Sequence, residues 1–437
     1  MVRLQKRLHA EDAKKSEGDA TVAGWVKSVR AVGKLAFVIL RDSSGTIQLT
    51  FKPDVKDFES VKNLTPESVI AATGDVVRGK VKSGENELVV KEWSVLSRSE
   101  TPLPIDVWGN TPTGLDKRLD WRYLDLRSPK NLLVFRIQTA VEAAMREFWL
   151  KNGFIEIHSP KIMGSPSETG AELFEVEYFG RSGYLAQSPQ FYKQMAMMAG
   201  FEKVFEIAPV FRANPSETSR HDTEYTSVDA EMSWLDSEED VMAHEEKMIV
   251  HVLESVKKQF GSEIKEAFGV DVVVPETPFP RVTIKEAHKI TGRAPAETHD
   301  FTDLDSEGEK LMGTHIQEKK KHEFVFLTEF PWAVRPFYTM RNEKNPAVTK
   351  SFDLLWKGLE ITSGSQREHR YDVLLKQAAE KKMKMENVQF YLDFFRYGTP
   401  PHGGLGFGLT RFLMQMLGVK NVREVTFVPH DMKRLVP

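Results

Sequence analysis

The alternation of apolar and polar residues separates a β-rich beginning of the chain from a mixed remainder. Between residues 20 and 97, short apolar runs alternate between two faces as strands do, and turn-forming residues separate them. Five strands are expected, at Ala20–Arg30, Ala36–Arg41, Ile47–Phe51, Val69–Val81 and Glu87–Leu96, with a helical stretch at about Val55–Leu64. This order is typical of an OB-type barrel, although another five-stranded β domain also fits it.

Beyond the predicted barrel the periodicity changes. Residues 98–128 are rich in proline, glycine and aspartate, as linkers are. Apolar residues then recur at helical spacing from Lys130 to Lys151, and a second helix is expected from a cap at Ser237 to Phe260. We therefore expect an α+β protein with an N-terminal domain at residues 1–104, a hinge at 105–129 and a larger domain at 130–437.

Composition excludes several classes of protein. The 437 residues include no cysteine, which excludes disulfides and thiolate zinc sites. No apolar run reaches the length of a membrane-spanning helix, and the N-terminus has no apolar signal core. The net charge is −3, but the first 104 residues carry a small excess of basic residues. We expect a cytoplasmic protein without a membrane partner, which meets nucleic acid through its N-terminal domain.

The segment from Phe205 to Glu231 carries candidate chemistry, since it is predicted to form a strand, a charged loop and a second strand. Arg212 ends the first strand, Arg220 and His221 close the loop, and Tyr225 opens the return strand. Arginine offers a planar fork to phosphate oxygens, and a tyrosine ring can hold a planar base. Taken alone, an arginine-rich hairpin is more often a solvated turn than a nucleotide site.

Two further segments change that interpretation. Residues 403–412 read as a glycine-rich strand that enters a helix near Leu409, with Arg411 on its first turn. Residues 153–160 follow the first long helix and end a strand with Ser159-Pro160. In chain order, the three segments resemble motifs 1, 2 and 3 of class II aminoacyl-tRNA synthetases. The resemblance implies a catalytic domain at 130–437, built on an antiparallel sheet flanked by helices, and a homodimer interface at motif 1.

Four other segments resemble aspartyl-tRNA synthetases in particular. They are an amino-acid-site segment, a strand end, a loop over the substrate and a sequence leading into the catalytic domain, at Leu185–Gln194, Ser363–His369, Ser167–Phe174 and Arg118–Arg127. The resemblance covers nearly the whole chain and suits the compact archaeal and eukaryotic type. It implies ATP-dependent ligation of L-aspartate to tRNA through aspartyl-adenylate, with Mg²⁺ bound.

The resemblance also implies roles for individual residues. For catalysis these are Arg212, Glu360 and Arg411. Aspartate would contact Glu168, Gln190, Phe191, Tyr192, Lys193, Arg212, Ser363 and Arg367. ATP would contact Arg212, Ala213, Asn214, Arg220, His221, Asp222, Tyr225, Glu360, Gly408, Leu409, Thr410 and Arg411. Magnesium would be held by Asp353, Glu360 and Ser363, on a probable strand and its end; alone, either carboxylate would be read as a hydrogen-bonded group on an edge strand.

For tRNA, the resemblance implies that Arg30, Phe37 and Gln48 of the barrel contact the anticodon, although a lone strand phenylalanine is more often part of a core. Enzymes of this type that charge only tRNA-Asp carry a tryptophan and a lysine at the positions of Lys27 and about Gly84. This difference leaves open whether tRNA-Asn is charged as well, which would require an amidotransferase as partner.

Two rival interpretations remain. An asparaginyl-tRNA synthetase is disfavoured because an amide substrate has no use for the cation of Lys193. A synthetase paralogue without aminoacylation activity is disfavoured by the intact Arg212, Glu360, Arg367 and Arg411. The motif-3 helix also departs from its usual pattern, since Thr410 stands where an acidic residue is common, but Arg411 is in place.

Overall fold

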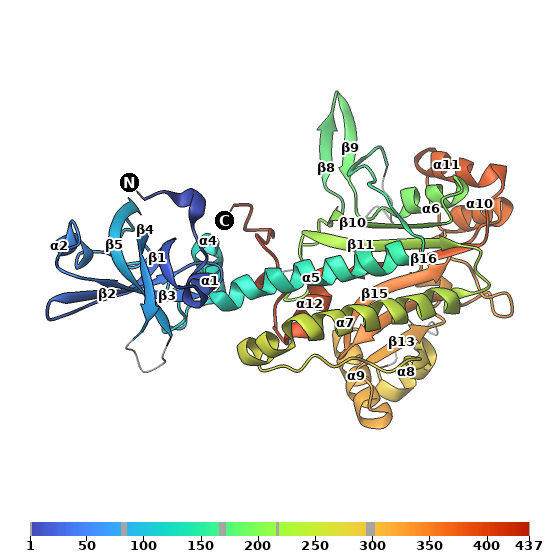
Figure 1. Ribbon diagram of the computed structural model, residues 1–437. Helices are drawn as coiled ribbons and strands as arrows, with labels where there is room; N and C mark the ends of the chain where they lie inside the picture. The colour runs from blue at the N-terminus through green and yellow to red at the C-terminus, as the bar shows by residue number, and fades with distance from the viewer. Residues whose placement is uncertain (1, 80–84, 166–171, 216–217, 294–301, 437) are drawn as a thin grey trace. The chain divides into compact units, whose positions relative to one another are not determined.

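The computed structural model describes residues 2–79, 85–165, 172–215, 218–293 and 302–436 (Figure 1). The chain divides into two compact units, Met1–Pro129 and Lys130–Pro437. Among the helices of the described ranges, none combines the length and the apolar character that crossing a membrane requires.

The first unit contains a closed barrel with the strand order β1-β2-β3-β5-β4, which confirms the expected OB-type barrel. Its strands are β1 (Gly18–Val32), β2 (Leu35–Arg41), β3 (Thr46–Phe51), β4 (Val69–Arg78) and β5 (Asn86–Ser97). Its helices are η1 (Leu4–Lys6), α1 (Ala10–Lys15), α2 (Phe58–Val61), α3 (Leu115–Asp120) and α4 (Arg122–Asp125). The described part of the fourth strand ends at Arg78, and the expected end at Val81 lies outside the described residues. The helical stretch is shorter than expected.

Alternation along β2 separates the barrel core from an outer face. Ala36, Val38 and Leu40 are buried, whereas Phe37 is only half-buried. In the antiparallel pairing, Phe37 lies opposite Arg30 on β1. Directly paired residues share a face of the sheet, so these two side chains leave the barrel on the same side.

The segment predicted as a linker packs within the first unit. It forms α3 and α4, and Arg122 is 1% exposed with its guanidinium 2.6 Å from Asp125. Arg41 donates to Glu67 at 2.9 Å and to the carbonyl of Arg127 at 3.0 Å. These bonds tie the segment to the barrel sheet, because a buried guanidinium needs such partners.

The second unit is built on an eight-stranded sheet with the order β12-β13-β14-β15-β16-β11-β10-β6, antiparallel except at its two edges. Its strands are β6 (Ile155–Glu156), β10 (Lys203–Phe211), β11 (Glu224–Ser233), β12 (Arg281–Thr283), β13 (Phe324–Thr328), β14 (Ser351–Trp356), β15 (Leu359–Gln366) and β16 (His402–Gly408). A three-stranded sheet projects from it (Figure 1), formed by β7 (Ile162–Met163), β8 (Glu175–Tyr178) and β9 (Arg181–Leu185).

Helices surround this sheet. They are α5 (Pro129–Lys151), α6 (Gln190–Met198), α7 (Glu238–Phe268), α8 (Ile284–Thr291), α9 (Ser306–Lys320), α10 (Tyr371–Glu380), α11 (Met385–Asp393) and α12 (Leu409–Leu417). Short 3-10 turns complete the unit at η2 (Trp332–Val334), η3 (Phe394–Tyr397) and η4 (Val422–Glu424).

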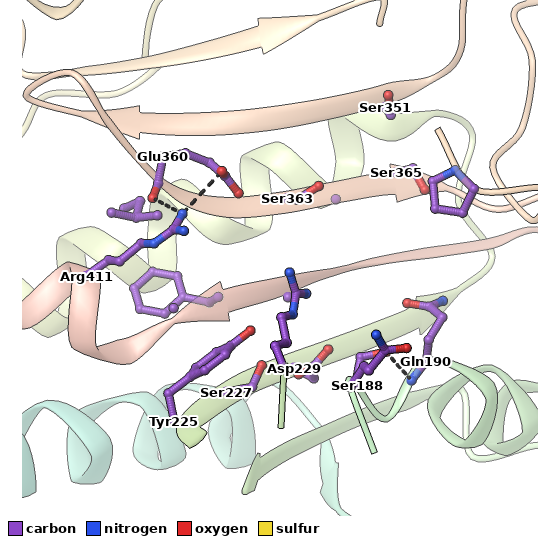
Figure 2. Close-up of a pocket in the computed structure, with 18 of the residues that line it drawn as sticks. Ser188, Gln190, Tyr225, Ser227, Asp229, Ser351, Glu360, Ser363, Ser365 and Arg411 are labelled. Atoms are coloured by element: carbon purple, nitrogen blue, oxygen red, sulfur yellow. Dashed lines mark hydrogen bonds and ion pairs between the residues drawn. The ribbon is translucent and has the colours of Figure 1, made fainter. Parts of the chain in front are cut away.

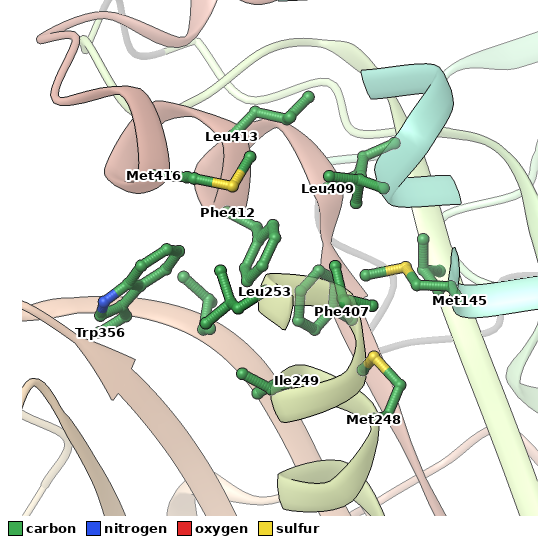
Figure 3. Close-up of a cluster of buried hydrophobic side chains, with 14 of the residues drawn as sticks. Met145, Met248, Ile249, Leu253, Trp356, Phe407, Leu409, Phe412, Leu413 and Met416 are labelled. Atoms are coloured by element: carbon green, nitrogen blue, oxygen red, sulfur yellow. The ribbon is translucent and has the colours of Figure 1, made fainter. Parts of the chain in front are cut away.

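The main hydrophobic core lies where α5, α7 and α12 pack on one face of the sheet (Figures 1 and 3). Phe407 of β16 and Ile249 of α7 meet in it. Helix α7 begins with a capping box at Ser237 and continues beyond the expected Phe260, because the fully buried Ile264 extends its apolar face. It ends at Gly269, whose φ of 72° only glycine adopts readily.

Candidate active site

The opposite face of the large sheet carries a cavity of 460 Å³ (Figure 2). Its floor is the central strand β16, where the alternating positions Gly404, Gly406 and Gly408 bring no side chain to this face, while Leu405 and Phe407 are buried. Gly404 has a second reason to be glycine. A Cβ atom there would lie 2.1 Å from the carbonyl of Ala230, so a larger residue would push the strands apart.

The strands beside this floor supply polar side chains at matching positions. Gly406 pairs with Asp229 on one side and Ser363 on the other, and Gly404 pairs with Glu231 and Ser365. Along β11, Ser227, Asp229 and Glu231 alternate with the buried Val228 and Ala230. The period of two in a strand therefore brings acidic and hydroxyl groups to the cavity and apolar groups to the core.

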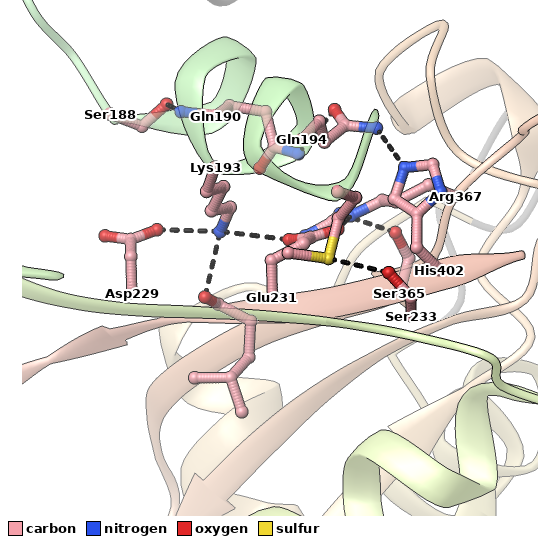
Figure 4. A network of polar contacts seen from close by, with 12 residues as sticks. Ser188, Gln190, Lys193, Gln194, Asp229, Glu231, Ser233, Ser365, Arg367 and His402 are labelled. Atoms are coloured by element: carbon pink, nitrogen blue, oxygen red, sulfur yellow. Dashed lines mark hydrogen bonds and ion pairs between the residues drawn. The ribbon is translucent and has the colours of Figure 1, made fainter. Parts of the chain in front are cut away.

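At one end of the cavity, two buried cations face two buried carboxylates (Figure 4). The ammonium of Lys193 donates to Asp229 at 2.8 Å and to the carbonyl of Leu405 at 2.9 Å. The guanidinium of Arg367 donates to both oxygens of Glu231, at 3.0 and 3.2 Å, and to Ser365. Burial alone would raise the pKa of Glu231, but Arg367 and Lys193 lower it, so this carboxyl is ionised.

Both cations also line the cavity. Glu231 holds Arg367 from outside the cavity lining, whereas Asp229 lines the cavity beside Lys193. An arginine has five N–H donors, more than the contacts of Arg367 use. A further carboxylate that enters the cavity would therefore meet a preformed pair of donors. This end of the cavity is suited to an acidic side chain of about the size of aspartate.

At the other end, arginines and aromatic groups gather around the first turn of α12. Arg212 follows β10, and its backbone N–H donates to the carbonyl of Thr223 across the hairpin. Arg411 donates to the carboxylate of Glu360 at 3.2 Å and to the carbonyl of Arg220 at 3.3 Å. A helix N-terminus and several guanidiniums together favour a phosphate chain.

Further groups of this nucleotide end come from the loop between β10 and β11. Arg220 bonds to Glu309 and Ser306 of α9. Burial and the neighbouring Arg411 and Arg220 lower the pKa of His221, and burial raises the pKa of Asp222 to about 6. Tyr225 lines the cavity on the same strand as Asp229. The loop thus brings the cation of Arg220 and the neutral ring of His221 to the space where phosphates would lie, together with the acidic Asp222.

The predicted magnesium residues lie on two paired strands rather than on one strand and its end. Asp353 of β14 is opposite Ser363 of β15. Asp353 accepts from Arg335 at 2.6 Å and does not line the cavity, and Arg335 also donates to Ser363 at 3.1 Å. Glu360 does line the cavity, and the guanidiniums around it, led by Arg411, lower its pKa against the effect of burial.

These donors fit a hard cation only in part. Magnesium prefers oxygen ligands and takes few of them from protein. The carboxylate of Glu360 and the hydroxyl of Ser363 line the cavity and can supply such oxygens, although each also contacts a guanidinium, whereas Asp353 does not line the cavity. Within the described ranges, no cluster of three or more histidine or acidic side chains could hold a metal by itself. Phosphate oxygens would have to complete the site.

Most residues predicted to bind substrates line this cavity. They are Gln190, Lys193, Arg212, Asn214, Arg220, His221, Asp222, Tyr225, Glu360, Ser363, Arg367, Gly408, Thr410 and Arg411. The cavity lining does not include Phe191, Tyr192, Ala213 and Leu409. Phe191 and Leu409 are each 1% exposed and pack in hydrophobic cores instead. Glu168 lies outside the described residues, as does Gly84.

Sequence analysis missed other residues of the site. Asp229 lines the cavity and pairs with Lys193, the fully buried Glu231 pairs with Arg367, and Arg335 and Tyr338 enter the cavity from a loop. The two acids carry a signal that could have been used, since they occupy alternate positions of an otherwise small and apolar strand. Nothing local marks Arg335, because its partners lie on other strands.

On the barrel, the predicted anticodon residues share one outer face. Gln48 lies opposite Ile39 on β2, two residues from Phe37, and therefore on the same side of the sheet. Its amide donates to Glu87 at 2.6 Å, and so does the hydroxyl of Thr50. Lys27 places its ammonium 3.9 Å from the centre of the Trp108 ring. Glu87 is a polar group of this face that sequence analysis did not single out.

Comparisons with known proteins agree with this geometry. A family model described as tRNA synthetases class II (D, K and N) matches residues 114–432, and one described as an OB-fold nucleic acid binding domain matches residues 20–96. The aspartate–tRNA(Asp/Asn) ligase of Methanopyrus kandleri is 46% identical over 422 residues, which is 96% of each chain. The aspartate–tRNA(Asp) ligase of Pyrococcus abyssi is 44% identical over 420 residues, which is 95% of each chain.

Solved structures of both specificities are similar to the whole chain. The asparaginyl-tRNA synthetase from Pyrococcus horikoshii complexed with asparaginyl-adenylate has a TM-score of 0.91 at 29% identity, and each chain is covered completely. The aspartyl tRNA synthetase from Entamoeba histolytica has a TM-score of 0.86 at 32% identity, with 99% of this chain and 93% of that chain covered. The chain therefore belongs to the class II tRNA synthetases of the D, K and N group, within the aspartate–tRNA ligases.

Proposed function

We propose that this protein ligates L-aspartate to tRNA in two steps, through aspartyl-adenylate. The observation that carries the proposal is the buried arrangement of Lys193 and Arg367 against Asp229 and Glu231 at the end of the cavity. The carboxylate side chain of aspartate matches these two cations. Asparagine would leave their charges poorly paired, and a site of this kind rejects such an analogue by ~10⁴-fold.

The first step joins aspartate to ATP and releases pyrophosphate. The α-carboxylate of aspartate is ionised at neutral pH, so the attack on the α-phosphorus needs no general base. Arg212 lines the cavity, and in this proposal it holds both reacting groups. Arg220 and Arg411 would neutralise the outer phosphates, and Tyr225 would stack on adenine. Positioning and charge neutralisation supply the rate enhancement.

A magnesium ion would be held by Glu360 and Ser363 together with phosphate oxygens. When bound, it would add positive charge where the phosphates gather. Glu360 keeps the ionised form that such binding needs, because the surrounding guanidiniums lower its pKa. In this proposal, Asp353 supports the site through Arg335, which bonds to both Asp353 and Ser363.

Pyrophosphate exchange tests the amino acid specificity. Purified protein is incubated with ATP, Mg²⁺, labelled pyrophosphate and either aspartate or asparagine. Aspartate-dependent exchange is the expected result. Exchange with asparagine alone would instead make the protein an asparaginyl-tRNA synthetase, and the absence of exchange with either amino acid would favour a paralogue without this activity.

We infer that tRNA-Asn is a second acceptor besides tRNA-Asp. Lys27 occupies the position where enzymes restricted to tRNA-Asp carry tryptophan, and its ammonium is engaged with the ring of Trp108. The relatives include proteins of both kinds. Charging purified tRNA-Asp and tRNA-Asn transcripts side by side with labelled aspartate tests this. Comparable charging of both is expected, and charging of tRNA-Asp alone would contradict it.

Two partners follow from this proposal. Aspartate attached to tRNA-Asn must be amidated before translation, which requires a tRNA-dependent amidotransferase in the same cytoplasm. The motif-1 region around Ser159 would form a homodimer interface, and the nearby Ile155 and Ile162 are each 47% exposed, as residues awaiting a partner surface often are. Light scattering at micromolar concentration should give twice the mass of one chain, and a monomer would contradict the interface.

A further inference from the structure

Behind the amino-acid end of the cavity lies a chain of buried polar groups that the proposed chemistry does not use (Figure 4). Gln194 of α6, Tyr391 of α11 and His402 of β16 are each 0% exposed. The amide of Gln194 meets the Nε2 atom of His402 at 2.9 Å, the hydroxyl of Tyr391 at 2.9 Å and the amide of Gln190 at 2.8 Å. Gln190, at the end of this chain, lines the cavity.

The direction of every hydrogen bond among these polar groups follows from His402, the group farthest from the cavity. The Nδ1 atom of His402 lies 2.9 Å from the carbonyl of Pro400, which can only accept, so Nδ1 carries the proton. Burial lowers the pKa of His402 to about 4, so the ring is neutral at pH 7 and its Nε2 atom is an acceptor. Gln194 must therefore turn its Nε2 donor toward His402.

This orientation decides what Gln190 offers to the cavity. With Nε2 of Gln194 facing the histidine, its Oε1 atom accepts from Tyr391 and from Nε2 of Gln190. The NH₂ group of Gln190 then faces the buried side, where one of its two N–H donors bonds to Gln194, and its Oε1 atom is left as an acceptor for the cavity. Reversal of the Gln194 amide would reverse that of Gln190 and present NH₂ to the substrate.

We propose that Gln194, held by His402 and Tyr391, is a positioning residue that turns the amide oxygen of Gln190 toward the α-ammonium group of the amino acid substrate. The inference rests on the proposed function, since it takes the substrate to be an α-amino acid. An ammonium group needs acceptors, and an NH₂ group in that place would repel it. The hydrogen-bonded groups that end at the carbonyl of Pro400 thus select for the α-amino group of the substrate, while Lys193 and Arg367 select for its side chain.

Replacing Gln194 by leucine tests the proposal, because leucine fills the space but cannot orient an amide. A hydrogen bond to a charged group contributes about 1.5–3 kcal/mol, so we expect the KM for aspartate in pyrophosphate exchange to rise ~10-fold or more. The kcat and the KM for ATP should stay close to those of the unaltered protein. The matched control is Gln138→Leu, which removes a half-buried glutamine of α5 that bonds to Glu142 and does not line the cavity. It should leave the KM for aspartate unchanged.

A second substitution separates orientation from general packing. A glutamate at position 190 presents oxygen whichever way it turns, but with Gln194 intact it places a carboxylate against Oε1 of that residue. Gln190→Glu should therefore raise the KM for aspartate in the unaltered background and lower it in the Gln194→Leu background. Reversal of sign between the two backgrounds is the result expected of an orienting residue.

Two outcomes overturn the proposal. If Gln194→Leu leaves the KM for aspartate unchanged while the unaltered protein is active, Gln194 does not orient Gln190. If Gln190→Glu raises the KM equally in both backgrounds, the role of Gln194 is one of packing. Absence of aspartate-dependent exchange in the unaltered protein would instead overturn the proposed function, and with it this inference.

Discussion

Four charged side chains, Lys193, Arg367, Asp229 and Glu231, are buried together and balance one another. Burying a charge is costly unless it is paired and hydrogen-bonded, and each of the two cations has at least one carboxylate within 3.0 Å. This pairing offsets much of the cost of burying the four charges, and the remaining N–H donors of Arg367 are available to a substrate carboxylate. This is why the specificity of the cavity can be argued from single residues.

Arg367→Ala is expected to abolish aspartate activation while the KM for ATP changes little, because Arg367 lies at the amino-acid end only. The substitution also leaves Glu231 without its closest partner, which should destabilise the fold by about 3–5 kcal/mol. Exchange kinetics with both substrates and urea unfolding measure the two effects. Adding Glu231→Gln should restore stability without restoring activity; recovery of aspartate activation in that double variant would contradict the assigned role.

At this scale, sequence reasoning reached the residues whose neighbours in the chain form a recognisable motif. Lys193 stands in the segment Gln187–Gln194 and Arg367 follows a strand, so both were predicted. Gln194 and His402 are 208 residues apart, and Arg335 finds Asp353 on another strand, so their pairing depends on the tertiary fold alone. Asp353 was expected to hold metal, and its pairing with Arg335 could not be foreseen without the fold.

Among the elements, β16 is the most constrained, because both of its faces are used. Leu405 and Phe407 pack in the core, and its glycines form the floor of the cavity. Helix α7 covers the opposite face of the sheet and carries Glu245, which is fully buried. The positions of both elements were predicted, but the end of α7 was not, because burial of Ile264 outweighs the weak helix preference of Gly261.

Gly404→Ala and Gly406→Ala should impair different properties, the first the stability of the fold and the second the binding of aspartate. A methyl group at 404 would lie 2.1 Å from a backbone oxygen, so that variant should lose much of its stability. At 406 the nearest atom is a carboxylate oxygen of Asp229 at 3.3 Å, so that variant should fold but bind aspartate more weakly, with ATP binding little changed. Thermal unfolding and exchange kinetics distinguish the two, and equal loss of stability in both would contradict the assignment of the floor.

Glu245 makes the stability of the second unit depend on pH. Burial and the nearby Glu246 and Asp353 raise its pKa to about 8, against 4.5 for an exposed glutamate. The folded state therefore holds this proton more tightly than the unfolded state, so the contribution of Glu245 is favourable below pH 4.5 and is lost as the pH rises through about 8. Glu245→Gln should remove a slope of about 1.4 kcal/mol per pH unit in this range.

Urea unfolding at pH 5 and pH 8 measures this effect. The variant should gain stability relative to the unaltered protein as the pH rises. Glu254→Gln, on an exposed position of the same helix, makes the same change in formal charge and should show no such trend. If the difference in the free energy of unfolding between Glu245→Gln and the unaltered protein does not vary with pH, the raised pKa assigned to Glu245 is contradicted.

At the scale of the whole molecule, the two compact units belong to families with different roles, one in nucleic acid binding and one in catalysis. The barrel matches a nucleic-acid-binding family and the second unit matches the synthetase family, each over its own range. The fold class was predictable from the strand pattern and the three motifs. The composition of residues 98–128 predicted a linker, because composition does not show that Arg122 would be buried there or that Arg127 would bond to Arg41 of β2.

Phe37→Ala should separate these two activities. Stacking on an aromatic side chain contributes ~1–3 kcal/mol per base, so the kcat/KM for tRNA charging should fall ~5-fold or more. Exchange, which needs no tRNA, should keep its rate. Phe58→Ala, at another half-buried phenylalanine of the first unit, is the matched control and should charge tRNA normally. A fall in exchange with Phe37→Ala, or equal charging defects in both variants, would contradict the anticodon assignment.

The length of the glycine-rich strand β16 also sets the distance between the two substrates. Its Leu405 carbonyl holds Lys193, and six residues later Arg411 stands at the phosphate end. Because β16 advances about 3.3 Å per residue as far as Gly408 and α12 advances about 1.5 Å per residue from Leu409, the number of residues sets the distance between these points. One inserted residue would lengthen the strand and move the side chain of Leu405 or Phe407 to the face of the cavity, since side chains alternate between the two faces of a strand. The register of a single strand therefore determines at once how far apart the two substrates lie and whether there is room for either.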